Sequence, residues 1–178
     1  IGDLTIDISF GGNFFCIVPA EQVGLQIEPR NGRQLTDLGL TILAHANAAY
    51  PVQHPVQTHI TSMELVEFTE AGDDSRNPRN VVVFGDANFD RSPCGTGTCA
   101  RMAELHAQGR LPLGQTFVHE SIIGTRFEGM LVREEQVGPF TAAVPRVQGS
   151  AYITGLNTFV LDPADPLAEG FNTLSREQ

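Results

Sequence analysis

The stretch from Gly97 to Gln108 is the feature that most limits how this chain can fold. Its periodicity predicts a helix, but the apolar side chains go most of the way round instead of forming one stripe. Only Arg101, Glu104 and Gln108 gather on a polar edge. The apolar members are Cys99, Ala100, Met102, Ala103, Leu105 and Ala107. Because such a helix must be buried and the remaining sequence predicts mostly strands, we expect an α+β fold with a curved sheet around a central helix.

Short apolar runs separated by turn residues fill most of the other sequence and predict strands. The expected strands cover Ile1–Ser9, Phe14–Val18, Thr58–Glu70, Val81–Gly85, Gln115–Gly124, Thr125–Glu134, Phe140–Val147 and Ser150–Leu161. Gly11-Gly12-Asn13 permits a bulge or a turn after the first of them. An amphipathic helix is predicted over Gln34–Tyr50, with Asn31 or Thr36 as its N-cap. The polar tract Ala71–Asn80 predicts an exposed loop between two strands.

The composition narrows the classes of function. The length of 178 residues suits one domain, and the net charge is −10, with 11 basic residues that are all arginine. The chain has no basic cluster, which argues against binding to nucleic acid or to an anionic membrane. No apolar run approaches the roughly 18–20 residues of a membrane span. A small molecule therefore remains the open class of ligand.

The cysteines indicate the redox compartment of the protein, the first residue indicates where the chain starts, and the absence of certain motifs bears on its cofactors. Cys16, Cys94 and Cys99 form neither a disulfide framework nor a CxxC pair, which favours reduced thiols and a cytoplasmic protein. Because the chain starts at Ile1, inside an expected strand, we infer that it begins within a larger protein. No GxGxxG, no P-loop and no compact ligand cluster is present, and no lysine is available for a Schiff base, so we expect no metal, nicotinamide, flavin or pyridoxal phosphate.

Residues 90–99, DRSPCGTGTC, stand where a strand gives way to the central helix. The N–H groups and the positive dipole at a helix N-terminus bind anions, and the glycines let a ligand approach the backbone. The same field is expected to lower the pKa of the Cys94 thiol. A carboxylate held by the N–H groups of Gly95 and Thr96 would place its α-carbon beside Cys94, and Asp90 would bind an ammonium group. These groups predict a site for proton transfer at the α-carbon of an amino acid.

Plainer interpretations stand beside this one. A Gly/Thr-rich turn is common helix-capping chemistry, and a cysteine there can be structural. His45 and His106 lie on predicted helices, while His54 and His59 flank a loop without further ligands nearby, so a metal site is not favoured. The segment at His119 has no second histidine at helical spacing, which favours a structural or supporting role.

Four segments resemble the proline racemase family, which includes 4-hydroxyproline epimerases and 3-hydroxyproline dehydratases. Residues 90–98 (DRSPCGTGT) are similar to the second cysteine motif of the family. Three companions follow the family's order, namely DISFGGNFF at 7–15, HESIIGT at 119–125 and GSAYITG at 149–155, so nearly the whole chain is covered. The resemblance implies a diaminopimelate epimerase-like fold. In that fold two similar lobes, each a curved and mostly antiparallel sheet around a central helix, flank the active site.

The resemblance also implies roles for residues. Cys94 would be one of two catalytic cysteines that face opposite sides of the α-carbon, in a cofactor-independent isomerase of proline or 4-hydroxyproline. Five further residues would belong to the substrate site: Asp90 would bind the ring nitrogen, Gly95 and Thr96 the carboxylate, and Phe84 the apolar ring, while Asn13 lies in a stretch that approaches the cleft.

The family's first cysteine motif, of Met-Cys-Gly-His type, is absent from this chain. Cys16 stands in an expected strand and Cys99 in the same segment as Cys94, so both are expected to be packing residues. We therefore expect residues 1–161 to form the second lobe and residues 162–178 a surface tail that returns to the missing first lobe. Because inversion needs a base on each face, this chain alone should be inactive.

Several alternatives stay open. A trans-3-hydroxyproline dehydratase would share the fold, although such enzymes carry Thr where Cys94 stands, so the cysteine favours racemisation or epimerisation. A non-catalytic amino-acid-binding lobe and a cysteine hydrolase are alternatives from other classes, the latter without a visible His–Asp set. The sequence does not decide between proline and 4-hydroxyproline, and it leaves a homodimer open.

Overall fold

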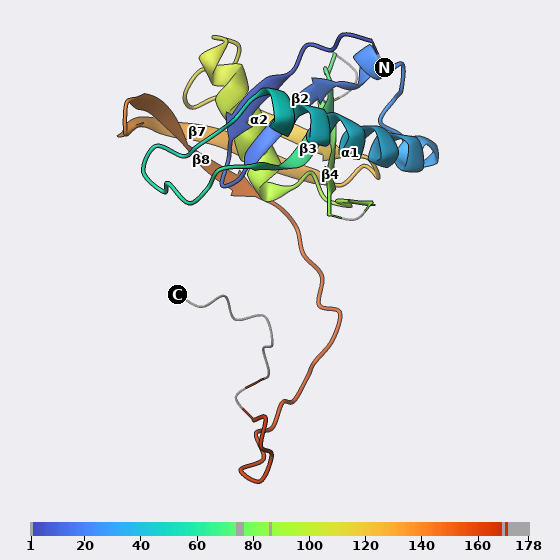
Figure 1. Cartoon of the computed structure of the whole chain (residues 1–178), viewed down its shortest axis with the longest axis vertical. Coiled ribbons are helices and arrows are strands. Elements are labelled where there is room, and N and C mark those ends of the chain that lie inside the picture. Colours follow the sequence, from blue (N-terminus) through green and yellow to red (C-terminus); the bar gives the residue numbers. More distant parts are fainter. Residues whose placement is uncertain (1, 74–76, 86, 169, 171–178) are drawn as a thin grey trace.

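A single curled sheet, built from strands far apart in the sequence, organises the fold (Figure 1). The computed structural model describes residues 2–73, 77–85, 87–168 and 170. The strands in that part of the chain are β1 (Asp7–Phe10), β2 (Phe14–Pro19), β3 (Met63–Glu70), β4 (Arg79–Phe84), β5 (Asn88–Phe89), β6 (Thr116–Ser121), β7 (Arg126–Val137) and β8 (Phe140–Gln148). Their order across the sheet is β1-β2-β3-β4-β6-β7-β8, with β5 paired to β4. The pairs β2/β3 and β4/β6 are parallel and the others antiparallel, so the sheet is mostly antiparallel, as expected.

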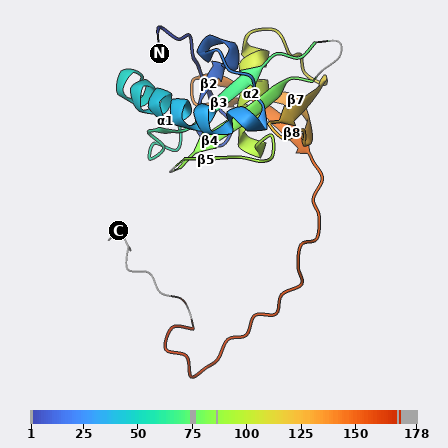
Figure 2. The same ribbon diagram turned by 90° about the vertical axis from the view of Figure 1, so that its right-hand side faces the viewer.

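Two helices pack on opposite faces of the sheet. α1 (Gly32–Ala49) contacts β3 and β4, whereas α2 (Gly95–Ala107) contacts β1 and β2 near one end of the sheet and β7 and β8 at the other. The sheet therefore curls around α2 and leaves α1 outside the curl (Figure 2). Two short 3₁₀ helices, η1 (Ala20–Val23) and η2 (Pro29–Asn31), lie between β2 and α1. The predicted α+β class with a central helix is confirmed.

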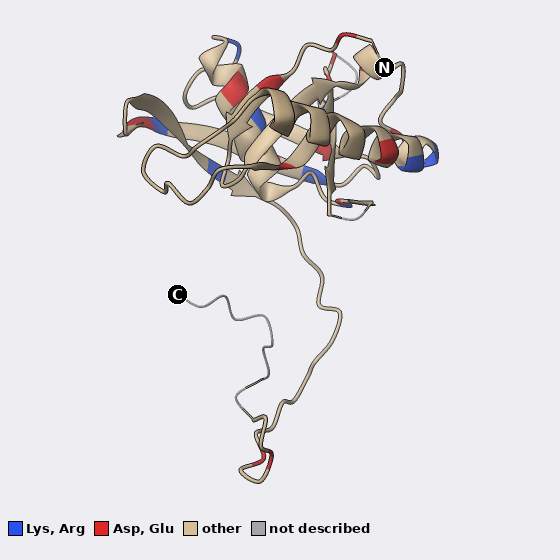
Figure 3. Ribbon diagram, viewed as in Figure 1, with Lys and Arg blue, Asp and Glu red and all other residues tan. Residues whose placement is uncertain are grey.

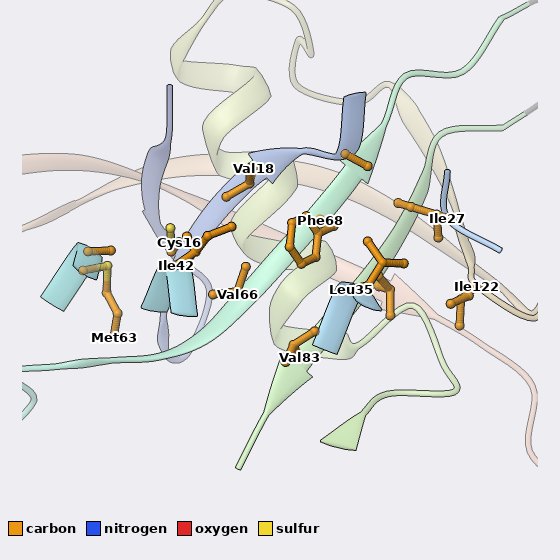
Figure 4. Packing of buried hydrophobic residues seen from close by; sticks show 13 residues of the cluster. Cys16, Val18, Ile27, Leu35, Ile42, Met63, Val66, Phe68, Val83 and Ile122 are labelled. Atoms are coloured by element: carbon orange, nitrogen blue, oxygen red, sulfur yellow. The ribbon is translucent and has the colours of Figure 1, made fainter. Parts of the chain in front are cut away.

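The larger hydrophobic core lies between α1 and the sheet (Figure 4). Leu35 and Ile42 of α1 face Val66 and Phe68 of β3 in this cluster. Each fully buried side chain of this kind contributes about 1.5–3 kcal/mol to folding. α1 approaches β4 closely because it carries Gly39, where an added Cβ would lie 3.1 Å from the side chain of Val83. The amphipathic pattern predicted for this helix is thus used to cover one sheet face.

The inner core, around α2, is divided into two smaller clusters. Phe15, Ile17 and Val82 of the sheet pack on Ala100 of α2, next to the partly buried Cys94. A second cluster lies farther along the helix and contains Met102, Leu105, Leu111, Phe117 and Leu131. The α2 side of the sheet is therefore packed close to the residues that begin this helix.

Two of the three residues on the polar edge of α2 are buried. Arg101 and Glu104 are both buried, and the Arg101 guanidinium donates to the Glu104 carboxylate, whereas Gln108 is exposed. Glu104 and Gln108 border, together with Ala103 and Ala107, an open groove of about 790 Å³ between β1, α2 and the β7–β8 hairpin. Burial of the charges is tolerated because they pair with each other across one turn of the helix.

Three predicted strands differ clearly from the structure. The strand expected over Thr58–Glu70 begins only at Met63. β1 begins at Asp7, because the described residues before it pair with no neighbouring strand: Thr5 bonds to the Gln22 side chain, and Leu4 and Ile6 pack on the larger core, while Ile1 lies outside the described residues. The strand expected over Ser150–Leu161 is absent, and this segment runs away from the body as exposed chain (Figure 1). A strand needs a neighbour for its backbone N–H and C=O groups, and none of the described residues lies beside it. Its large apolar side chains are 80–96% exposed: Tyr152, Ile153, Leu156, Phe159, Val160 and Leu161.

The remaining boundaries follow the sequence with small shifts. Asn31 is the N-cap of α1, and Thr36 lies inside the helix. Positive φ at Gly109 ends α2 one residue after its C-cap, as expected. The loop between β3 and β4 ends before Arg79, and residues 74–76 of that loop lie outside the described part of the chain.

The surface of the described chain shows no concentrated charge or membrane-spanning element. Arginines are scattered singly over the face drawn in Figure 3. No described helix is both long enough and apolar enough to cross a membrane. No three His, Cys, Asp or Glu side chains come together as potential metal ligands within residues 2–73, 77–85, 87–168 and 170.

Candidate active site

The site is centred on Cys94, the N-cap residue of α2. The preceding loop is fixed by two side chains. Asp90 Oδ1 accepts from the N–H and the hydroxyl of Ser92, and the Ser92 hydroxyl oxygen accepts from the Cys94 N–H at 3.1 Å. Such short Asx and Ser turns are local alternatives to helix, so they stop the helix from extending backwards past Cys94. The sequence 90–94 therefore places a thiol at the first turn of a buried helix.

The Cys94 backbone is strained and its thiol is held in a defined position. Its φ is +60°, a region that non-glycine residues adopt at a cost of about 1–3 kcal/mol and often at functional sites. The Gly97 N–H donates to Sγ at 3.4 Å, and the Thr96 hydroxyl lies 3.5 Å from Sγ. The chain around Cys94 thus stabilises one direction of the thiol instead of relaxing into a regular cap.

The pKa of Cys94 corrects a prediction from the sequence. Burial raises the pKa of this thiol, and the hydrogen bonds from Thr96 and from the Gly97 N–H only partly oppose that effect. Negative charge on Asp90 and Glu67 acts in the same direction as burial. The helix field was expected to lower the pKa, but the thiol packs against the inner core, where a thiolate is poorly solvated. Burial therefore favours the neutral, protonated form of the Cys94 thiol.

The backbone beside Cys94 can bind an anion. Gly95 and Thr96 are the first two residues of α2, so their N–H groups have no acceptor within the helix. Gly95 is exposed and Thr96 half-buried, which leaves room for a ligand at this end. An added Cβ at Gly95 would meet nothing within 4 Å. The helix start next to the thiol is therefore accessible, and anion binding by these N–H groups stays a prediction.

The turn between β1 and β2 packs on the same end of α2. An added Cβ at Gly11 would lie 2.1 Å from the Thr96 carbonyl oxygen and 2.4 Å from the Ala100 nitrogen. Gly12, with a φ of +124°, would meet the Thr96 side chain at 2.8 Å. The turn that precedes Asn13 therefore lies against the first turn of α2, and a role of Asn13 in binding stays a prediction. The sequence predicted the turn but not its close approach to α2.

Phe84 lies at the end of β4, on the side of the sheet that faces α2. Val82, two residues earlier and so on the same face, would be 3.0 Å from a Cβ at Gly97. Phe84 is 38% exposed. Its contribution to an apolar wall around a ligand stays a prediction.

The sequence missed a group of buried polar residues beneath the motif. Glu67 of β3, Asn80 of β4 and His119 of β6 are fully buried on the α2 side. Asn80 Nδ2 donates to the Pro93 carbonyl and to Glu67, so the group reaches the residue before Cys94. The alternating pattern of strand 58–70 predicted one solvated face, and no local feature distinguished Glu67 from an exposed carboxylate. The other two cysteines have no comparable surroundings: Cys16 is buried in the larger core, and burial raises the pKa of Cys16 and that of Cys99 to about 11.

Comparison of the sequence with known proteins identifies one family. The family model described as proline racemase matches residues 1–172. The chain belongs to the proline racemase family. It is 49% identical over 172 residues to a proline racemase of Clostridioides difficile, covering 96% of this chain and 51% of that protein. It is 47% identical over 171 residues to a 4-hydroxyproline 2-epimerase of Streptosporangium roseum, with 96% and 51% covered.

Solved structures of the proline racemase family share the fold. A hydroxyproline epimerase from Agrobacterium vitis, with bound trans-4-hydroxy-L-proline, superimposes with a TM-score of 0.83 at 35% identity, over 96% of this chain and 49% of that one. A probable proline racemase from Agrobacterium radiobacter K84, with bound carbonate, gives a TM-score of 0.84 at 36% identity, over 96% and 50%. The sequence thus spans about half the length of these relatives.

Proposed function

We propose that the complete protein containing this lobe interconverts the α-carbon configurations of proline or 4-hydroxyproline, with Cys94 as one of two acid/base thiols. The observation that carries the proposal is the Cys94 thiol beside the open N–H groups of Gly95 and Thr96. A carboxylate bound there brings its α-carbon within reach of the thiol. Relatives named as proline racemase and 4-hydroxyproline epimerase support the choice of an imino acid.

In the proposed complex each group has one task. The Gly95 and Thr96 N–H groups bind the substrate carboxylate and stabilise the charge that spreads into it when the α-proton leaves. Asp90, whose Oδ1 is engaged by Ser92, offers its other carboxylate oxygen to the cationic ring nitrogen. Phe84 and Asn13 border the ring. Binding the two charged ends of the substrate fixes the α-carbon between the two lobes.

Proton transfer follows from the state of Cys94. Because burial raises the pKa of Cys94, the thiol carries a proton and acts as the acid that protonates the α-carbon on its own face. A thiolate on the opposite face removes the α-proton in the same turnover. After this turnover Cys94 is the thiolate and the opposite group is the thiol. The pair can then catalyse the reaction in the reverse direction. No metal or cofactor takes part in this mechanism.

The opposite face is provided by a first lobe that this chain does not contain. The described cysteines Cys16 and Cys99 lie in the larger core and along α2, not across an open site from Cys94. We expect the chain alone to be inactive and the first lobe to restore activity. A dehydratase acting on trans-3-hydroxyproline, or a lobe that only binds amino acids, would share the cradle but not the need for a thiol at residue 94.

The exposed C-terminal segment fits the same arrangement. Six large apolar side chains between Tyr152 and Leu161 are at least 80% exposed, which marks a surface that another part of the protein covers. We infer that this segment, with the tail after it, returns to the first lobe. Limited proteolysis tests this: cleavage within residues 150–161 should be fast in the isolated chain and slow in the complete protein. Equal rates would contradict it.

The function itself is tested with the complete protein and three substrates. Optical rotation should fall to zero with L-proline or change to a different value with trans-4-hydroxy-L-proline, and trans-3-hydroxy-L-proline should not lose water. Dehydration of the last substrate without isomerisation of the others would replace the proposal with the dehydratase. Binding of all three without turnover would leave a binding lobe.

A further inference from the structure

The peptide bond before Cys94 is clamped from beneath by two buried side chains. The Pro93 carbonyl accepts from Asn80 Nδ2 at 2.7 Å and from the Thr98 hydroxyl at 3.2 Å. The φ angle of Cys94 is rotation about the bond that follows this peptide. Fixing the Pro93 carbonyl therefore fixes the plane against which the strained φ of +60° is set. Strained conformations persist only where their surroundings determine them in this way.

The donors in this clamp determine the protonation of His119. The Thr98 hydroxyl has one hydrogen, and the Pro93 carbonyl can only accept it. At 3.1 Å the same hydroxyl must therefore accept from His119 Nδ1–H. Burial lowers the pKa of His119 to about 3, so the ring is neutral and Nε2 carries a lone pair.

The same reasoning extends to Glu67. Asn80 uses one amide hydrogen on the Pro93 carbonyl and the other on Glu67 Oε1, at 2.8 Å. Burial raises the pKa of Glu67 to about 8, which leaves a proton for Oε2. The bare His119 Nε2 lies 3.9 Å from Glu67 Oε1, so a neutral carboxylic acid faces a hydrogen-bond acceptor. Glu67 Oε2, Asn80 Oδ1 and His119 Nε2 have no hydrogen-bond partner among the described residues.

We propose that Glu67 and His119 are positioning residues: acting through Asn80 and Thr98, they hold the Pro93–Cys94 peptide and so direct the Cys94 thiol. They come from β3 and β6, on either side of the strand that carries Asn80, and all three lie on the face that packs against α2. Their role for catalysis rests on the proposed function of Cys94. Their effect on the direction of the thiol does not.

Removing one hydroxyl tests the clamp with little change of shape. In the complete protein, Thr98→Val removes the bond to the Pro93 carbonyl and the acceptor for His119 Nδ1, and Thr98→Ser keeps both. Thr36→Val is the matched control, because the Thr36 hydroxyl is also buried and donates to a helix carbonyl, that of Gly32 at 2.8 Å. Thr36 lies in α1, away from the site, so its loss should affect stability alone.

The readouts are turnover and the pH profile of Cys94 alkylation by iodoacetamide, followed by peptide mapping. Thr98→Val should lower kcat by about tenfold to a hundredfold with little change in KM, as small misplacements of a catalytic group do. It should also move the alkylation midpoint to higher pH, because the thiolate loses its contact with the Gly97 N–H. Thr98→Val changes neither Asp90 nor Glu67, which are the ionisable groups that face Cys94. Thr98→Ser and Thr36→Val should keep the wild-type values.

A second pair of variants keeps the test decisive if Thr98→Val does not fold. Glu67→Gln retains an oxygen for Asn80 and supplies N–H toward His119, so it should keep kcat within about twofold, as a neutral mimic should. Both Glu67→Gln and Glu67→Leu remove the negative charge that raises the pKa of Cys94, so kcat is the readout that separates them. Glu67→Leu should lower kcat. Equal kcat for Gln and Leu, or a Thr98→Val protein indistinguishable from Thr36→Val, would overturn the proposal. A shifted alkylation midpoint in a protein that isomerises no imino acid would support the clamp and refute the proposed function.

Discussion

Replacing Gly11 with alanine should damage the site from outside it. The new Cβ would lie 2.1 Å from the Thr96 carbonyl oxygen and 2.4 Å from the Ala100 nitrogen, both backbone atoms of α2 that cannot rotate away. The β1–β2 turn and the helix must separate by about 1 Å, and overpacking of this kind costs about 3 kcal/mol or more. For a domain of this size that corresponds to a fall in Tm of about 6–12 °C.

Thermal unfolding of the complete protein followed by calorimetry measures the effect. Gly95→Ala is the matched control for stability, since it lies on the same helix turn and its Cβ would meet nothing within 4 Å. Because Thr96 also belongs to the anion cradle, Gly11→Ala should reduce affinity for the substrate carboxylate as well. If the Tm of Gly11→Ala were within about 2 °C of the Tm of Gly95→Ala, the turn would not approach α2 as described.

Asp90→Ala should weaken binding of pyrrole-2-carboxylate by about 1.5–3 kcal/mol in calorimetry, because the neutral pyrrole N–H loses the carboxylate that accepts its hydrogen bond; unchanged affinity would leave Asp90 only its role in holding Ser92. Burial raises the pKa of Glu67 to about 8, so the unfolded chain releases a proton that the folded chain keeps, and stability should fall as pH rises toward 8. Between pH 6.5 and pH 8 the denaturant midpoint of the wild type should fall relative to that of Glu67→Gln. The proton that His119 takes up on unfolding is common to both proteins, so it cancels in this comparison. An equal change of midpoint in both proteins would contradict the role of the Glu67 carboxyl. Activity should survive dialysis against a chelator in the presence of a thiol reductant; activity that returned only with added metal would refute the thiol mechanism.

The fold was predictable where the pattern is local. The nearly all-apolar face of Gly97–Gln108 requires burial, and the glycines and threonines before it require a helix start, so the central helix and the position of Cys94 follow from residues close together in the sequence. The curl of the sheet follows from the same requirement. The family resemblance of residues 90–98 added the chemistry, and the family is confirmed by the comparisons.

What the sequence could not provide depends on distant strands. The pKa of Cys94 was expected to fall with the helix field, but Phe15, Ile17 and Val82, from two other segments, bury the thiol and raise it. Glu67 has the alternation of a solvated strand residue, and only the packing of α2 against that face makes it buried.

The predicted strand over Ser150–Leu161 illustrates a different limit. Its alternating apolar residues have the composition of a strand, yet a strand exists only where another strand pairs with it. In the described chain no partner lies beside the segment, and its apolar side chains are exposed. The strand prediction from composition is therefore wrong for this segment, because composition does not show whether a partner strand lies beside it.

The most direct test of the account is isomerisation by the complete protein with Cys94→Ser. It is followed by the change in optical rotation of L-proline or trans-4-hydroxy-L-proline, whichever the wild type converts. A serine hydroxyl is a far weaker acid than a thiol of ordinary pKa about 8.5, so isomerisation should be abolished while calorimetry shows an intact fold and retained binding of pyrrole-2-carboxylate. Cys99→Ser, five residues along the same segment, should remain active. Undiminished isomerisation by Cys94→Ser would remove this thiol from the mechanism.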